Sequence, residues 1–238
     1  MENYRRYAVF YAPDPASDLA QRAASWLGWD VHAGGAAAQP VIDRLDLAEA
    51  TATPRKYGFH GTLKPPFRLA EGTDAAGLSA GLEAFAAQTA PVRLDGIEVS
   101  ALGRFVALAP TGDTAALSTL AGAVVAGFEP FRAPLTEAEI AKRNPDKLSA
   151  RQRASLDRWG YPHVFEDFRF HLTLSGPRTP DQISPLVAAA RAHFGAVIDG
   201  PLTLDALTLF GERPDGMFEV VHRYPLTGSR AASAAATA

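Results

Sequence analysis

Cysteine is absent from this 238-residue sequence, and neither sign of charge is in large excess, since the net charge at pH 7 is −3. Without cysteine the chain has no disulfide bond, no thiolate nucleophile and no cysteine-ligated zinc site. Without a basic excess it is poorly suited to coating nucleic acid or an anionic membrane. These absences exclude thiol-dependent, zinc-finger and nucleic-acid-coating proteins.

Long apolar runs are also missing. No segment reaches the length of a membrane-spanning helix, and the N-terminal MENYRRYAVFYAP is too short and too polar for a secretory signal. The composition, 47% hydrophobic and 21% charged, is that of a globular protein long enough to bury a sizeable core. We therefore expect a cytoplasmic enzyme or binding protein without a membrane partner.

Two segments nearly repeat each other: HGTL at residues 60–63 and HLTL at residues 171–174. Both follow aromatic residues and precede proline, in YGFHGTLKPPF and DFRFHLTLSGP, a pattern typical of a β-strand and its end. We predict the first strand at about 57–64, and we expect Pro65 and Pro66 to end it.

Side chains alternate between the two faces of a strand. His60 and Thr62 should therefore share one face of the first strand, and His171 and Thr173 one face of the second. The opposite faces are apolar and should be buried; they carry Phe59, Leu63, Phe170, Leu172 and Leu174. Each strand then has an apolar underside and an upper side with an imidazole and a hydroxyl.

The same order of elements follows each motif: a strand, a helix and two further strands. Apolar spacing and turn residues predict the flanking elements, namely strands at 5–12, within 91–110 and on both sides of ERPDG, and helices at about 15–28, 74–88, 114–127 and from Thr179. The spacing from His60 to Leu94 differs by one residue from that between His171 and Leu204. This agreement indicates an internal duplication.

We expect a single bilobal α+β domain over residues 1–238. Two duplicated lobes, related by an approximate two-fold, should line a central cleft with antiparallel sheets and carry helices outside. We predict a first half at about 5–130, a connector at about 131–165, a second half at about 166–226, and a disordered low-complexity tail at 227–238.

The connector has a distinct character, because it is highly charged and contains two capping-box patterns, at 136–139 and 149–152. These patterns predict two short helices. A charged segment of this kind is either a solvated surface or a lid over the cleft, and the sequence leaves both interpretations open.

Two facing histidines can divide an acid–base reaction, because one imidazole takes a proton near neutral pH while the other gives one. A threonine two residues after each histidine places a hydroxyl beside each imidazole. Such a group of four suits the tetrahedral oxygens of a phosphodiester. The chemistry therefore favours a site at His60, Thr62, His171 and Thr173.

Other side chains are candidate substrate-binding groups. Lys64 should share the face of His60, and Arg169 the face of His171, so either could supply positive charge to a phosphate. Tyr7 and Tyr11 share one face of the first strand, where they either line the cleft or pack in the core. Arg104 opens a strand and is a phosphate ligand or a surface residue.

HGTL and HLTL on duplicated α+β halves resemble the two HxTx motifs that define the 2H phosphoesterase superfamily. The resemblance implies metal-independent phosphodiester chemistry without a cofactor, in which His60 and His171 form the acid–base pair. It implies that Thr62 and Thr173 bind the non-bridging oxygens. Within the superfamily, RYAVFYAP and WGYPHVFEDFRFHLTLSG resemble a branch linked to bacterial phosphonate metabolism.

The resemblance implies hydrolysis of a cyclic or small phosphodiester, such as a ribose or sugar cyclic phosphate. One alternative is RNA end processing at a 2′,3′-cyclic phosphate or a 2′,5′ linkage, although the acidic net charge disfavours long RNA. Another is a non-catalytic nucleotide-binding module. A metal site would need a ligand such as Glu166 or Asp167 beside His171, and no HxH or HxxxH spacing occurs. No feature of the sequence indicates the oligomeric state.

Overall fold

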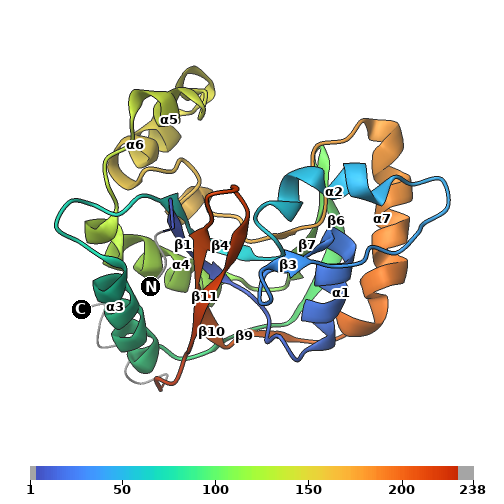
Figure 1. The fold of residues 1–238 in the computed structure, drawn as a ribbon, viewed down its shortest axis with the longest axis horizontal. Coiled ribbons are helices and arrows are strands. Elements are labelled where there is room, and N and C mark those ends of the chain that lie inside the picture. The colour runs from blue at the N-terminus through green and yellow to red at the C-terminus, as the bar shows by residue number, and fades with distance from the viewer. Residues whose placement is uncertain (1–3, 230–238) are drawn as a thin grey trace.

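A seven-stranded antiparallel sheet lies at the centre of the computed structural model, which describes residues 4–229. Its order is β11-β10-β1-β4-β8-β7-β6 (Figure 1). The strands are β1 (Tyr7–Tyr11), β4 (Gly61–Phe67), β6 (Gly96–Leu102), β7 (Phe105–Thr111), β8 (Leu172–Thr173), β10 (Ala206–Glu212) and β11 (Phe218–Pro225). Two short ribbons flank the sheet, β2 (Trp29–Asp30) with β3 (Gly35–Ala36), and β5 (Val92–Leu94) with β9 (Leu202–Leu204).

Helices cover one face of this sheet. They are α1 (Asp18–Leu27), α2 (Leu47–Arg55), α3 (Ala75–Gln88), α4 (Ala115–Gly127) and α7 (Pro180–Phe194). All five contribute buried residues to one large core together with Val9, Leu63 and Leu172 of the sheet. The other face carries a smaller core around Phe10 and Phe210. The α+β class with antiparallel strands is confirmed.

The two halves of the chain exchange their hairpins. The β6–β7 hairpin of the first half pairs with β8, which carries the second motif, whereas the β10–β11 hairpin of the second half pairs with β1 beside β4. The helices follow the same exchange, because α3 packs on β10 and β11 while α7 packs on β6 and β7. Each end of the sheet therefore combines elements of both halves, and the strands join in one sheet rather than in one sheet per half.

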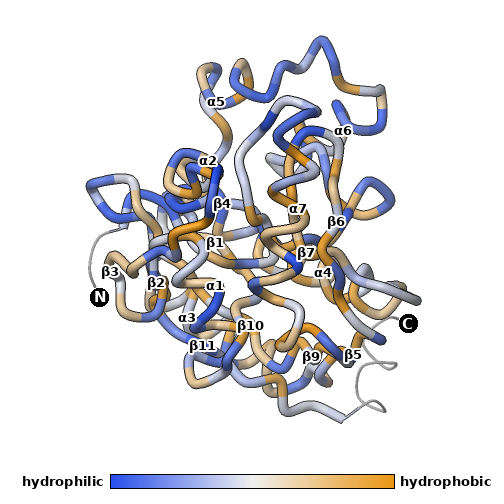
Figure 2. The backbone as a smooth tube through the Cα atoms, turned by 90° about the vertical axis from the view of Figure 1, so that its right-hand side faces the viewer, coloured by the Kyte–Doolittle hydropathy of each residue, from blue (hydrophilic) through white to orange (hydrophobic). Residues whose placement is uncertain are grey.

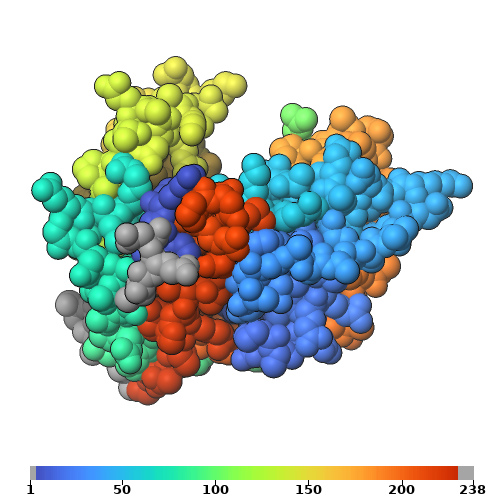
Figure 3. All heavy atoms as spheres, in the orientation of Figure 1, coloured from blue at the N-terminus to red at the C-terminus, as the bar shows by residue number. Residues whose placement is uncertain are grey.

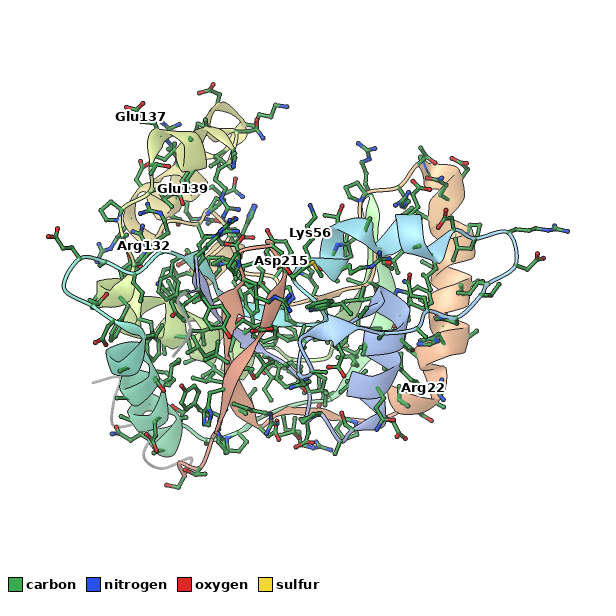
Figure 4. All side chains as sticks on the ribbon, viewed as in Figure 1. Arg22, Lys56, Arg132, Glu137, Glu139 and Asp215 are labelled. Atoms are coloured by element: carbon green, nitrogen blue, oxygen red, sulfur yellow. The ribbon has the colours of Figure 1, made fainter. Side chains whose placement is uncertain are left out.

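The connector stands apart from the sheet. Its helices α5 (Glu137–Ala141) and α6 (Ala150–Trp159) form a projection at the upper left of Figure 1, and their tube is mostly hydrophilic in Figure 2. Both predicted capping boxes are confirmed. Arg68, next after β4, forms an ion pair of 3.0 Å with Glu139 and so fixes α5 to the sheet. Figure 4 shows Glu137 and Glu139 on the projection and Arg132 at its base.

The predicted end of the first motif strand was wrong, because Pro65 and Pro66 lie inside β4. The ladder between β1 and β4 has two register shifts, which place these prolines at an irregular stretch where fewer ladder hydrogen bonds are needed. The predicted disordered tail begins too early, since the amides of Thr227 and Gly228 donate to the carbonyls of Ala86 and Thr89. The rest of that tail, 230–238, lies outside the described residues.

Within residues 4–229, every helix is too short or too polar to cross a membrane.

Candidate active site

The two motifs lie side by side because β4 and β8 are neighbours in the sheet. Gly61 is directly opposite Leu172 in this antiparallel pair. Moving one residue along each strand in opposite directions sets Thr62 beside His171, and His60 beside Thr173. Each histidine therefore lies across from the threonine of the other motif, and all four side chains share one face of the sheet.

The histidines are held in the same way. Nδ1 of His60 lies 2.9 Å from the carbonyl oxygen of Gly58, and Nδ1 of His171 lies 2.8 Å from that of Arg169. A carbonyl can only accept, so Nδ1 carries a proton and donates it in both cases. This tautomer leaves Nε2 of each ring for other partners.

His60 sits in an aromatic environment. Its ring stacks on Phe10 at a centroid distance of 4.0 Å and lies 6.0 Å from Tyr57 and 6.1 Å from Phe210. The pKa of His60 is lowered to about 4, mainly by burial against these rings; the bond to Gly58 opposes this effect, and the nearby charge of His171 adds to it. His60 is therefore neutral at pH 7. His171 packs less closely, 5.5 Å from the ring of Phe105.

Two adjoining cavities open over the motifs. The larger, of about 330 Å³, is lined by His60, Thr62 and Thr173; the smaller, of about 170 Å³, is lined by Thr62 and His171. Figure 3 shows the surface hollowed between the α5–α6 projection and α2. In the part of the chain that the structure describes, the threonine hydroxyls form no side-chain hydrogen bond, so both are available to a ligand.

The five residues predicted beneath the motifs are buried, as expected: Phe59, Leu63, Phe170, Leu172 and Leu174. Gly61 was overlooked, although it is the position at which HGTL differs from HLTL. A Cβ at Gly61 would lie 2.3 Å from Cε2 and Cζ of Phe170, so glycine lets that ring pack directly under the strand. The signal was present in the difference between the two copies.

The expected position of Lys64 was wrong. Phe10 pairs with Thr62 but Val9 pairs with Lys64, so β4 contains one extra residue between them. This bulge turns Lys64 to the core face. There it is 1% exposed, and its Nζ donates to Glu129 at 2.8 Å and to the carbonyl of Val125 at 2.9 Å. Lys64 is thus a core cation and does not face the cavity.

The strand β1 turns its tyrosines away from the cavities. Tyr7 and Tyr11 are 4% and 2% exposed and belong to the large core, which settles their alternatives in favour of packing. Arg104 lies exposed in the turn between β6 and β7, outside the lining of both cavities. Arg169 does line the smaller cavity, where its guanidinium donates to the carbonyls of Glu166 and Phe168.

Several cavity-lining residues were not predicted from sequence. They are Arg6, Tyr57, Arg143, Tyr161 and Ser175. Only Arg6 had a local signal, since alternation along β1 places it on the same face as Phe10. Its guanidinium donates to both carboxylate oxygens of Glu212, at 2.5 and 2.9 Å.

No group of three His, Asp or Glu residues within 4–229 is arranged to hold a metal ion. Of the two carboxylates considered beside His171, Asp167 is ion-paired with Arg151 at 2.7 Å.

Two proteins that are similar in sequence share the same name. The chain is 40% identical over 235 residues to "Ribose 1,5-bisphosphate phosphokinase PhnN" of Janthinobacterium sp. (strain Marseille), a match that covers 95% of this chain and 52% of that protein. It is 35% identical over 211 residues to the protein of the same name from Laribacter hongkongensis (strain HLHK9), covering 89% and 49%. The chain thus spans about half the length of these curated relatives.

Similar solved structures are more distant. TT0787 of Thermus thermophilus is 18% identical, with a TM-score of 0.44 over 94% of this chain and 100% of that one. The E. coli LigT complex with NADP+ is 15% identical, with a TM-score of 0.44 over 95% and 99%.

A family model described as "Protein of unknown function (DUF1045)" matches residues 62–219, which is more than half of the sequence and includes Thr62 and the whole second motif. The chain belongs to the DUF1045 family.

Proposed function

We propose that this protein is a phosphodiesterase that hydrolyses a cyclic or small phosphodiester with two histidines as its acid–base pair. The crosswise arrangement of His60, Thr173, Thr62 and His171 carries the proposal. It places two imidazoles, each with Nε2 available, and two hydroxyls without a hydrogen-bond partner in residues 4–229 along two adjoining cavities that share Thr62. Two acid–base groups together with two hydroxyl donors suit transfer at a tetrahedral phosphorus.

In this mechanism a water oxygen attacks phosphorus while Nε2 of His60 accepts the proton that the water loses. The bond from phosphorus to the leaving oxygen breaks, and His171, which enters the step protonated on both ring nitrogens, gives that oxygen the proton of its Nε2. Thr62 and Thr173 donate hydrogen bonds to the non-bridging oxygens. The stacked position of His60 against Phe10 supports its role as base, because burial keeps that ring neutral at pH 7. A bound phosphate anion would raise the basicity of His60 during turnover.

A ribose or other sugar cyclic phosphate from phosphonate breakdown is the substrate we favour. The relatives are named for a kinase of ribose 1,5-bisphosphate, and this chain corresponds to about half of their length. No lysine of this sequence follows glycine, so the GxxxxGK[ST] phosphate-binding pattern of many kinases is missing. We therefore assign the kinase activity in the relatives' name to their other half. To the half that matches this chain we assign the hydrolysis of a cyclic phosphate that precedes the kinase substrate.

RNA end processing is the second candidate. Tyr57 and Tyr161 line the larger cavity and could stack on a base. The cavity of about 330 Å³ is at the small end of ligand sites, which fits a terminal nucleotide rather than a long strand.

A substrate panel followed by ³¹P NMR tests the proposal. The panel contains ribose cyclic phosphates, nucleoside 2′,3′-cyclic phosphates and a 2′,5′-linked dinucleotide. We expect conversion of a cyclic phosphate to a phosphomonoester by the wild type, and a loss of roughly 10²–10⁴ in rate for His60→Gln and for His171→Gln. Turnover that is equal in wild type and both variants would contradict the proposal, as would a pure wild type that converts none of the panel.

A further inference from the structure

The connector supplies two side chains to the larger cavity, Arg143 after α5 and Tyr161 after α6. The Arg143 guanidinium carbon lies 4.9 Å from the centre of the Tyr161 ring, so the cation stacks on the aromatic face. Neither residue belongs to a motif strand. The projection therefore forms part of the cavity wall, in addition to the sheet.

The charge of Arg143 is not neutralised by any residue between 4 and 229. In the described part of the chain its side chain takes part in no ion pair and no hydrogen bond. Arg6, the other arginine lining this cavity, is held by both oxygens of Glu212 and is therefore already satisfied. Stacking uses only the face of the guanidinium, so the N–H donors at the edge of Arg143 remain available.

The position of Arg143 is fixed from both sides. Asn144 adopts a left-handed conformation, with φ of 49°, which turns the chain directly after Arg143. Gly160, with φ of 71°, turns the chain directly before Tyr161, and a Cβ there would lie 3.0 Å from the Arg132 guanidinium. These two turns bring the cation and its aromatic support together at the cavity wall.

We propose that Arg143 binds a second anionic group of the substrate, a phosphomonoester, while the four motif residues hold the phosphodiester. This inference rests on the proposed function and narrows its substrate class to sugar cyclic phosphates that carry an additional phosphate. An arginine fork matches phosphate oxygens with two parallel hydrogen bonds, and an unpaired, half-buried arginine gains most from such a partner. Two phosphates joined by one sugar suit a cavity of about 330 Å³.

The test compares ribose 1,2-cyclic phosphate with the same compound phosphorylated at O5. The readout is the preference of the enzyme, expressed as the ratio of kcat/KM for the phosphorylated compound to that for the other. We expect the wild type to prefer the phosphorylated compound, and Arg143→Gln to lower the ratio at least tenfold through a higher KM. Arg143→Lys should lie between them, because it keeps the charge but loses the fork.

Lys142→Gln is the matched control, since Lys142 is the adjacent exposed cation and lines neither cavity. It should leave the ratio at the wild-type value. A wild type without preference, or a ratio unchanged in Arg143→Gln, overturns the inference and leaves the phosphodiesterase proposal intact. If the wild type hydrolyses neither compound, the proposed function fails instead. The inference is then decided by calorimetric affinities of both compounds for wild type and Arg143→Gln, and equal affinities overturn it.

Discussion

Gly61 of β4 lies directly opposite Leu172 of β8, and this pairing sets the relative position of the two motifs. Because the strands are antiparallel, the histidine of each motif meets the threonine of the other. Beneath the pair, the Phe170 ring occupies the space that a side chain at Gly61 would need. The pairing thus links the core packing under the sheet to the geometry of the groups above it.

Gly61→Ala should disturb both the core packing under the sheet and the geometry of the motif side chains above it. The added Cβ would lie 2.3 Å from the Phe170 ring, so the ring or β4 must move. We expect a loss of stability of about 1–3 kcal/mol and reduced activity. Gly195→Ala is the control, because nothing lies within 4 Å of its added Cβ. Thermal unfolding and kcat are the measurements, and a Gly61→Ala variant indistinguishable from wild type would contradict this packing.

Substitutions of two neighbouring residues, His171 and Leu172, should affect activity and stability separately. Leu172 is 0% exposed, so Leu172→Ala should cost about 2–5 kcal/mol in the free energy of unfolding. His171→Ala should leave the melting temperature nearly unchanged and abolish most of the activity, since its ring faces the smaller cavity. Urea titrations and rate measurements on both variants would show the reverse pattern if the strand register were shifted by one residue.

The half-buried imidazole of His60 should make folding stability depend on pH. Its pKa is about 4 in the folded protein, below the value of 6.5 for a free imidazole. The unfolded chain therefore binds the proton first, and stability should fall as the pH drops from about 6.5 to about 4, by as much as about 3 kcal/mol. His60→Gln should lack this part of the pH dependence. Urea unfolding of wild type and His60→Gln at pH 7 and pH 4.5 measures this difference. Equal losses of unfolding free energy in the two proteins would show that His60 does not contribute.

The threonines should affect the rate without changing its pH dependence. A hydroxyl has no proton to exchange near neutral pH, so Thr62→Val and Thr173→Val should keep the shape of the pH–rate profile. Each should lower kcat by roughly 10²–10³, as expected for one lost donor to a phosphate oxygen. A shift along the pH axis of either limb of the pH–rate profile, in either variant, would mean that the threonine alters the pKa of the histidine beside it.

Local alternation was enough to predict the faces of the motif strands, and the burial of Phe59, Phe170 and Leu174 follows directly from it. The same rule failed at Lys64, because the bulge between β1 and β4 depends on the partner strand and leaves no trace in the local pattern. The capping boxes of α5 and α6 were readable, since a cap is formed by residues close in sequence.

Contacts between distant segments could not be predicted. The sequence does not reveal that the hairpins of the two halves exchange places, because strand pairing over long separations is decided by the whole fold. For the same reason Arg143 and Tyr161 were assigned only to a charged connector. The contact between Arg143 and Tyr161 at the cavity depends on two turns, at Asn144 and Gly160. It also depends on the ion pair that joins Glu139 to Arg68.

The pH profile of kcat/KM for hydrolysis tests the two-histidine mechanism most directly, in wild type, His60→Gln and His171→Gln and with or without a chelator. We expect a bell for the wild type, with an acidic limb set by His60 and displaced below the usual range of an imidazole. Each variant should lose one limb and roughly 10²–10⁴ in rate, and the chelator should change nothing. Activity that disappears on chelation and returns with added zinc or manganese, with both limbs retained in the histidine variants, would contradict the mechanism.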